Sequence, residues 1–458
     1  MLEAENKMGV MPVNRLLITM ALPMIISMLV QALYNIVDSI FVAMISENAL
    51  TAVSIAFTMQ NLMIAVASGT GVGINALLSR SLGQKNQALV NKTALNGIFL
   101  EIIGCLIFVV LGFTVITPFY TAQAGSGVNA AEIIQYGKEY LSIVLIMSFG
   151  LFAQVTFERL LQSTGRTIFT MITQGTGAII NLILDPIFIF VFKWGIAGAA
   201  LATVTGQIIA AAMALFFNIK KNTEINFSLK GFRPQWSVIK LILAVGIPST
   251  IMVSIGSIMT FSMNKILVAF SSTAVAVFGV YFKLNSFIFM PLFGMNNGLV
   301  PIISYNYGAG KRDRMMKAIR LAITYAFCIM VFGTLLFWIF PKQLLGLFNA
   351  SEDMLAIGIP ALRIISLSFP VAAFCIIFSS VFQSLGNGIY SMITSFARQL
   401  IALIPSAYIL ARIANFELAH IDNVWWSYNI AEVVSIIVSI FLFMRLYKNK
   451  ISHVGEKM

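Results

Sequence analysis

Residues 21–23 read ALP and residues 246–248 read GIP, while residues 79–83 read SRSLG and residues 304–308 read SYNYG. Both pairs of motifs are separated by 225 residues, and a third pair, farther along the chain, is separated by 221. A nearly constant offset over this length indicates two copies of one lobe, in which the helices have kept step and the loops have changed length. Internal symmetry of this kind is typical of secondary transporters.

The chain is much more apolar than a soluble domain. Of its 458 residues, 59% are apolar and 10% are charged, and the mean hydropathy is +0.92, whereas a soluble domain has about 25% charged residues. A helix of about 20 apolar residues spans a bilayer. Runs at least this long lie near residues 15–43, 50–78, 94–118, 138–161, 167–192, 196–219, 238–264, 274–302, 319–341, 355–382, 389–411 and 424–447. We predict an all-α membrane protein with twelve transmembrane helices in two pseudo-symmetric six-helix bundles.

These runs divide the chain into an N-lobe (1–219), a cytoplasmic linker (220–237) and a C-lobe with a cytoplasmic tail (238–458). Most of the 29 Lys and Arg residues fall in the loops on the same side as the termini, which the positive-inside rule assigns to the cytoplasm. We expect a multi-pass protein of the bacterial inner (plasma) membrane, with both termini cytoplasmic. The net charge of +12 follows from this orientation beside an anionic leaflet, so we expect no nucleic-acid partner.

Two aspartates interrupt the apolar runs of the N-lobe only. Asp38 and Asp185 correspond to Met263 and Ser406 in the second copy. Because a charge at the bilayer centre costs at least about 2.5 to 3.5 kcal/mol, an intramembrane acid needs a partner or a function. The predicted topology places both aspartates in the outer half of the membrane, at a shared depth.

Other polar side chains share a helix face with each aspartate. On the first span these are Gln31, Tyr34 and Asn35; on the fifth they are Gln174 and Asn181; and Thr203 lies at a similar depth on the sixth. Carboxylate, amide and hydroxyl oxygens are ligands for a small hard cation, and two close carboxylates tend to hold one proton between them. The alternative is that each aspartate only satisfies a helix end or a neighbouring amide. The agreement in depth favours a cation site.

The remaining intramembrane charges have weaker functional signals. Glu158 lies near the inner end of the fourth span, where a structural salt bridge and a transport role are equally consistent with its position. Glu101 is expected to be a paired structural acid. In the C-lobe, Lys283, Arg398 and Glu432 are expected to neutralise one another, because buried charges are usually paired.

Two motifs that suggest nucleotide binding fail on inspection. Residues 308–311 (GAGK) lack the other residues of a phosphate-binding loop, so we expect no ATP. The glycines of residues 69–73 lie in an apolar run, where close helix packing explains them better. His420 and His453 are the only histidines, and no metalloprotease or serine-hydrolase motif is present. We therefore expect neither an enzyme nor a cofactor.

Several of these residues form a recognisable set. They are the ALP of 21–23 followed by Asp38, the SRSLGQ of 79–84, the NLILDP of 181–186, and the C-lobe run of 289–308 that holds NNGLVP and NYG. Over essentially the whole chain this set resembles the multidrug and toxic compound extrusion (MATE) family, in particular its bacterial MepA-like branch.

The resemblance implies two six-helix bundles around a V-shaped cleft, and export of organic cations in exchange for H⁺ or Na⁺. By position, Asp38, Asn181, Asp185 and Thr203 match the cation site of the family's first lobe, and Pro23 matches a proline proposed to bend the first helix. The seventh and tenth spans lack the acids of sodium-driven members, which argues against a sodium site in the second lobe.

We therefore expect a monomeric secondary active multidrug efflux antiporter. Asp38 and Asp185 would be metal ligands only if the coupling ion is Na⁺. The side chains expected to line the substrate cavity are Gln31, Tyr34, Asn35, Glu158 and Gln174. A rival function is a lipid-linked saccharide flippase of the same superfamily, and the intramembrane cations Lys283 and Arg398 keep it open, because such cations can mark the path of an anionic substrate.

Overall fold

A computed structural model describes residues 5–123, 129–228 and 230–455, and within these ranges the chain forms helices and no strand. Ten helices of this part are long and apolar enough to cross a membrane, and two bent pairs raise the number to twelve. The pairs are α6 (Ala130–Ile146) with α7 (Phe149–Ser163), bent by 43°, and α14 (Glu352–Ser366) with α15 (Phe369–Ser384), bent by 49°. The predicted helical fold with twelve spans is confirmed.

The other N-lobe spans are α2 (Val13–Ala43), α3 (Glu47–Gly83), α4 (Gln87–Thr114), α8 (Thr167–Pro186) and α9 (Gly195–Lys221). The other C-lobe spans are α10 (Trp236–Val268), α11 (Ser272–Gly308), α12 (Arg312–Ile339), α16 (Gly388–Phe396) continuing into α17 (Ile404–Ile413), and α18 (Asp422–Leu446). Short helices are α1 (Lys7–Val10), α5 (Ile116–Gln123) and α13 (Pro341–Gly346). π-helical turns cover Ile187–Val191, Ala397–Leu403 and Tyr447–Ile451, and a 3₁₀ turn covers Leu418–His420.

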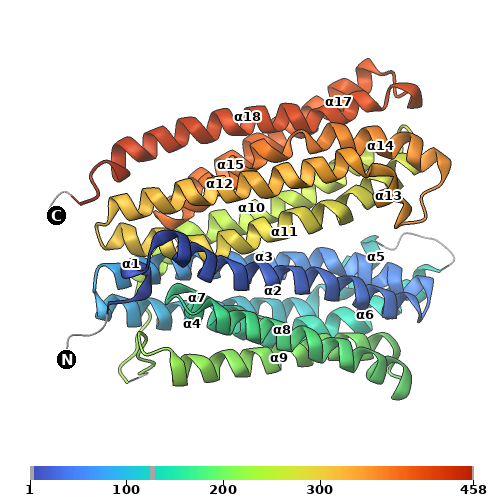
Figure 1. Ribbon diagram of the computed structural model, residues 1–458. Coiled ribbons are helices and arrows are strands. Elements are labelled where there is room, and N and C mark those ends of the chain that lie inside the picture. The colour runs from blue at the N-terminus through green and yellow to red at the C-terminus, as the bar shows by residue number, and fades with distance from the viewer. Residues whose placement is uncertain (1–4, 124–128, 229, 456–458) are drawn as a thin grey trace.

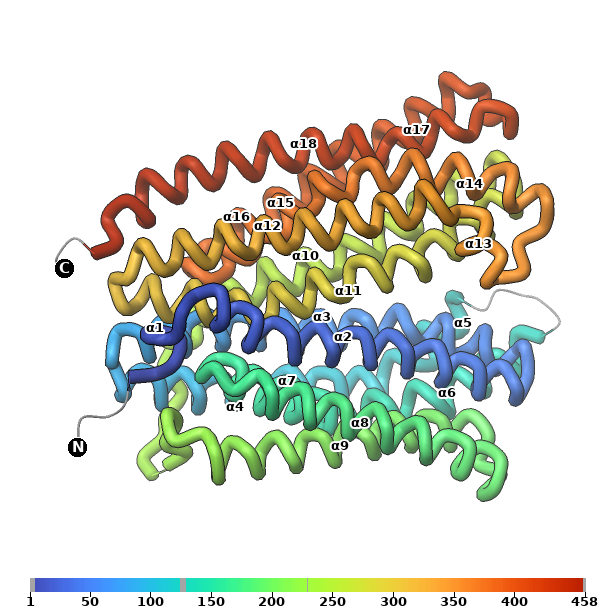
Figure 2. The backbone as a smooth tube through the Cα atoms, viewed as in Figure 1, coloured from blue at the N-terminus to red at the C-terminus, as the bar shows by residue number. Residues whose placement is uncertain are grey.

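The helix bounds repeat as the sequence motifs do. Helices α3 and α11 both contain 37 residues, and α4 and α12 both contain 28. The blue-to-green helices form one side of the molecule and the yellow-to-red helices the other (Figure 2). Both described chain ends lie at one end of the bundle (Figure 1), which is called the terminal end below. The predicted linker, 220–237, contains the loop from the end of α9 to the start of α10.

The repeated serines make the same hydrogen bond in each lobe. Ser79 Oγ donates to the carbonyl of Ser163 at 2.8 Å, and Ser304 Oγ donates to the carbonyl of Ser384 at 3.0 Å. Each bond ties a long helix to the C-terminal end of the bent span beside it. In hydrocarbon a freed carbonyl finds no water, so a serine that satisfies it stabilises the helix end.

The repeated glycines bring the two lobes together backbone to backbone. A Cβ atom on Gly83 would lie 2.0 Å from the carbonyl oxygen of Tyr305, and one on Gly308 would lie 2.1 Å from that of Arg80. The two contacts are related by the pseudo-two-fold axis of the duplication. Gly73 approaches the carbonyl of Ile242 in the same way, which confirms that the glycines of 69–73 serve helix packing. Small residues allow this approach between membrane helices.

Helix α1 is bound to both lobes at the terminal end. Asn6 Nδ2 donates to the carbonyl of Thr164 in the N-lobe at 3.0 Å. From the C-lobe, Asn306 Nδ2 donates to the carbonyl of Met8 at 3.1 Å, and Arg314 Nη2 donates to that of Met11 at 2.6 Å. Met8 is fully buried. The segment therefore bridges the two bundles at the terminal end.

We predict that Gly83→Ala and Gly308→Ala each lower the melting temperature of the detergent-purified protein. The added methyl group meets backbone atoms that cannot move aside alone, and overpacking typically costs about 1 to 3 kcal/mol. Gly279→Ala is the matched control, because it lies in α11 with no atom within 4 Å of its added Cβ. It should leave the melting temperature unchanged or raise it, since Ala is the better helix former. Equal stability of all three variants would contradict the close contact.

Candidate functional site

Helices α2 and α8 pack against each other and bring Asp38 and Asp185 together. The two side chains lie within hydrogen-bonding reach of each other. Asp185 is fully buried and Asp38 is half-buried. Within the described ranges, Oδ1 of each aspartate has no donor as a partner when both carboxyl groups are ionised. Two ionised carboxylates at this separation repel each other, and one proton or cation between them removes the repulsion. These two residues are called the acid pair below.

Asn181 and Thr203 extend the acid pair into a chain of hydrogen bonds. The network assigns the Asn181 carboxamide the orientation in which its nitrogen donates to Asp185 Oδ2 at 3.1 Å. Its oxygen then accepts from the backbone N–H of Thr203 at 2.9 Å and from Thr203 Oγ1 at 3.1 Å. The reverse orientation would put the amide oxygen against a carboxylate oxygen, which are both acceptors. The four residues that the sequence analysis assigned to a cation site therefore lie in one cluster.

The backbone is irregular immediately after the buried aspartate. Asp185 precedes Pro186, which has no N–H group to continue the α-helical hydrogen bonds. The chain then passes into the π-helical turn Ile187–Val191. Short π-helical turns often occur at functional sites, because they re-aim the side chains around them.

Two tyrosines stand near the acid pair. Tyr34, on α2, and the buried Tyr140, on α6, are both within electrostatic range of Asp38 and Asp185. Gln60 Nε2, from α3, donates to the Tyr140 hydroxyl at 3.3 Å. Tyr34 is among the cavity residues predicted from the sequence, whereas Tyr140 and Gln60 are not. The available signal was weak: a tyrosine in an apolar span needs a partner for its hydroxyl group.

The remaining predicted cavity residues do not form one group with the acid pair. Gln31 and Asn35 are exposed on α2, in the two turns before Asp38. Gln174 lies eleven residues before Asp185, or about 16 Å along α8. Its amide nitrogen donates to Glu158 Oε2 at 2.6 Å. The polar stripe of α8 thus serves two separate acids.

Glu158 is held by neutral donors. Thr173 Oγ1 and Gln154 Nε2 each donate to its Oε1 at 3.0 Å, in addition to the bond from Gln174. Among the described residues its carboxylate takes part in no ion pair, so the salt-bridge interpretation is wrong. The adjacent Arg159 donates instead to Gln162 Oε1 at 2.9 Å and, across the lobe boundary, to Asn297 Oδ1 at 3.0 Å.

Glu101 also differs from its predicted role. It is 2% exposed, and neither carboxylate oxygen has a hydrogen-bond partner within the described part of the chain. Arg159 is within electrostatic range of it, but the guanidinium group bonds Gln162 and Asn297. The expectation of a paired structural acid is therefore wrong.

The C-lobe charges form one pair, not a group of three. Arg398 Nη1 lies 3.1 Å from Glu432 Oε1. Arg398 is the second residue of the π-helical turn Ala397–Leu403. Lys283 lies over the ring of Phe348, 5.7 Å from its centroid. The prediction that Lys283 shares the neutralisation is wrong, since a cation–π contact accounts for its charge instead.

No group of three or more His, Cys, Asp or Glu residues able to hold a metal ion occurs in the described ranges.

Comparisons with known proteins agree with this architecture. The multidrug export protein MepA of Staphylococcus haemolyticus (strain JCSC1435) is 26% identical over 428 residues, which cover 93% of this chain and 92% of the relative. A solved structure of the outward-facing conformation of a multidrug resistance MATE family transporter of the MOP superfamily is 25% identical, with a TM-score of 0.91 and 99% of each chain covered. A second solved structure is that of a MOP superfamily transporter from Pyrococcus furiosus Vc1 (DSM3638). It is 26% identical, with a TM-score of 0.90 and 98% of each chain covered. The reverse polarity of its binding pocket suggests a different function for that transporter.

The family assignment rests on both lobes. The family model MatE matches residues 23–187 and 248–409, which together make up more than half of the chain and contain the acid pair. The two matched segments coincide with the two copies of the sequence repeat. The chain belongs to the MatE family, the multidrug and toxic compound extrusion (MATE) transporters, and is a multi-pass membrane protein of that family.

Proposed function

We propose that this protein is a secondary active antiporter that exports organic cations and drugs in exchange for a proton by alternating access. The observation that carries the proposal is the contact between Asp38 and the fully buried Asp185. A pair of carboxyl groups in an apolar bundle changes its net charge when one proton binds. That change alters which arrangement of the neighbouring helices is most stable.

The orientation of Asn181 supports a proton over Na⁺ as the coupling ion. A sodium site needs several oxygen ligands around one point, as hard cations generally do. Here the amide oxygen of Asn181 is occupied by Thr203, and its N–H₂ group faces Asp185. An amide nitrogen repels a cation and stabilises a carboxylate, so the cluster offers few oxygens beyond those of the two aspartates.

Helix α2 connects the acid pair to the contact between the lobes. It carries Asp38, and its backbone at Ala21 and Ile25 lies against Gly298 and Gly294 of α11. A shift of α2 after protonation therefore changes the packing between the lobes. We propose that the state described here is closed at the terminal end, which the positive-inside rule places in the cytoplasm, and receives its proton from the opposite side.

The energetics limit the stoichiometry. Expulsion of a monovalent cation against 100 mV costs about 2.3 kcal/mol, and one entering proton recovers the same amount. A one-for-one exchange is therefore driven by the chemical gradient of the proton alone. The proposed substrate class is supported by the buried acid pair of the N-lobe and by the MepA relatives, which are named multidrug export proteins. We propose that the transporter acts as a monomer in a bacterial plasma membrane.

The flippase alternative requires an available intramembrane cation. Arg398 is paired with Glu432, and Lys283 is stacked on Phe348. Neither group is without a partner, so neither favours an anionic substrate. The polarity of the chain's own buried cluster, two aspartates with Asn181 and Thr203, favours cationic cargo.

We predict that Asp38→Asn and Asp185→Asn each abolish driven efflux of a fluorescent dye cation from loaded proteoliposomes. Each change removes a group that binds and releases the coupling ion, while it preserves the size of the side chain. Asp353→Asn, in the exposed first turn of α14, is the matched control and should transport normally. Normal pumping by both acid-pair variants would exclude the proposed coupling site.

We predict further that an imposed pH gradient drives dye efflux and that an imposed sodium gradient at constant pH does not. The reason is the shortage of oxygen ligands around the acid pair. Efflux would be followed by dye fluorescence with each gradient applied alone. Sodium-driven efflux that Asp38→Asn removes would assign the same residues to Na⁺ and refute the proton.

The C-lobe ion pair should behave as a structural element. We predict that Glu432→Gln lowers the melting temperature more than the double change Arg398→Gln/Glu432→Gln, because the single change leaves a partly buried cation unpaired. Removal of one partner from a fully buried ion pair destabilises a protein by about 3 to 5 kcal/mol. Because the Arg398 side chain is 30% exposed, the loss of stability here should be smaller. Dye efflux by the double variant should persist. Loss of transport with unchanged stability would instead give the pair a role in substrate movement.

A further inference from the structure

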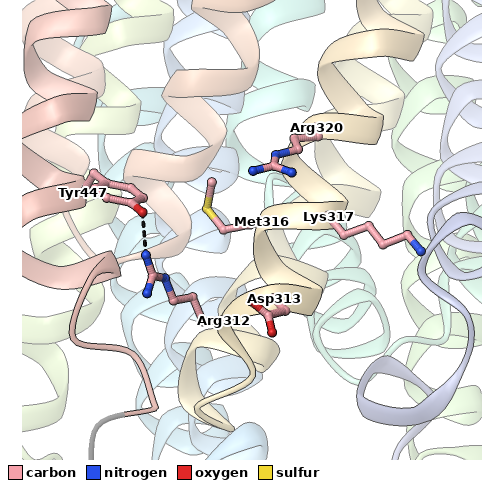
Figure 3. A pocket seen from close by; sticks show the side chains of 6 residues that line it. All are labelled: Arg312, Asp313, Met316, Lys317, Arg320 and Tyr447. Carbon is pink, nitrogen blue, oxygen red and sulfur yellow. Dashed lines mark hydrogen bonds between the residues drawn. The ribbon is translucent and has the colours of Figure 1, made fainter.

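Besides the acid pair of the N-lobe, a polar cavity lies in the C-lobe at the terminal end of the bundle. It is a cavity of about 590 Å³ between the start of α12 and the π-helical turn that follows α18. The residues lining it are Arg312, Asp313, Met316, Lys317, Arg320 and Tyr447 (Figure 3). Three cations stand against one carboxylate, so the cavity has a positive charge. The proposed ion exchange uses none of these residues.

Two arginines are arranged along one face of the cavity. Arg312, Met316 and Arg320 follow at intervals of four residues, which places them on one side of α12. Arg312 donates to the hydroxyl group of Tyr447, and its guanidinium carbon lies 5.5 Å from the centre of the Tyr447 ring. Figure 3 shows Arg320 and Arg312 on the side that faces Tyr447, whereas Lys317 points the opposite way. The tyrosine therefore holds one guanidinium group at the mouth of the cavity.

Aromatic side chains of α12, α15 and α18 pack against one another next to the cavity. Helices α12 and α18 both pack against α15, which is seen between them in Figure 1. Phe378 of α15 meets Phe443 of α18 at 4.7 Å between ring centroids, and Phe374 of α15 meets Phe327 of α12 at 5.9 Å. Phe443 is also 6.4 Å from Tyr447. Aromatic side chains of α15 and α18 therefore lie directly beside the charged cavity.

The surface of α12 and α18 beside these aromatic side chains is exposed and apolar. On α18, Met444 is 58% exposed and Ile440 is 44% exposed, and both lie on the Tyr447 side of the helix. Phe327 on α12 is 41% exposed. In a membrane protein such a surface faces acyl chains, so the charged cavity lies where a headgroup and its chains meet.

We propose that this cavity binds the headgroup of an anionic phospholipid, with the phosphate on Arg312 and Arg320 and the acyl chains against the exposed apolar side chains of α12 and α18. Guanidinium groups bind phosphate oxygens through paired N–H donors. Basic pockets between membrane helices on the cytoplasmic side are suited to anionic headgroups. Free phosphate would share the arginines but would make no contact with the exposed apolar side chains of α12 and α18, and for that reason the structure favours a lipid.

The test is lipid binding by the full-length, detergent-purified protein, measured by native mass spectrometry with phosphatidylglycerol and with phosphatidylcholine of the same chain length. Phosphatidylglycerol should bind more tightly. At about 1 kcal/mol for each basic residue near the membrane surface, Arg312→Gln and Arg320→Gln should each weaken its binding about fivefold, and the double variant about 25-fold. Phosphatidylcholine binding should change little.

Arg412→Gln is the matched control. Arg412, in the last turn of α17, also donates to a tyrosine, Tyr408, and lies 5.4 Å from the centre of its ring. This variant should bind phosphatidylglycerol as the parent does. The proposal is overturned if the Arg312→Gln/Arg320→Gln protein keeps its affinity, or if Arg412→Gln loses as much. It is also overturned if inorganic phosphate alone raises the melting temperature through Arg312 and phosphatidylglycerol does not.

Discussion

Hydrocarbon offers no hydrogen-bond partner, and this constraint determines how each polar group within the bundle is arranged. Glu158 has three neutral donors, Arg398 has Glu432, and Arg159 has Gln162 and Asn297. Both residues of the acid pair instead keep an oxygen without a donor among the described groups, as Glu101 and Glu432 also do. What distinguishes the acid pair is that its two carboxyl groups lie within hydrogen-bonding reach of each other. A stable fold would satisfy those oxygens permanently. A site that must bind and release an ion has to leave them available.

The duplication repeats the packing contacts of the two lobes but not the acid pair. The serine–carbonyl bonds of Ser79 and Ser304 and the reciprocal contacts of Gly83 and Gly308 occur in both lobes, so the two bundles meet through equivalent surfaces. The acid pair has no counterpart. Met263 is buried in the core, and the hydroxyl group of Ser406 bonds its own helix at Ala402. The same scaffold therefore carries the acid pair in one lobe only.

The spans and the acid cluster could be predicted because each follows from a local rule. Hydrophobic length identifies the helices, and helical periodicity places Asn181 and Asp185 on one face. Periodicity does not say which acid a polar residue will meet, and Gln174 consequently bonds Glu158 instead of the acid pair. The breaks at Met147–Ser148 and Leu367–Ser368 lie inside continuous apolar runs, where composition gives no boundary. Lys283 was misassigned because its partner is an aromatic ring, and a charge count does not consider rings as partners.

The hydrogen bonds of helix α1 bear on the rate of the proposed transport cycle. Its carbonyls accept from Asn306 and Arg314 on one lobe while Asn6 bonds the other lobe at Thr164. Any opening that separates the lobes at this end must first withdraw that short segment. In the alternating-access cycle proposed above, the release of these hydrogen bonds of residues 6–11 would be a kinetic barrier, so substitutions in this segment would change the turnover rate.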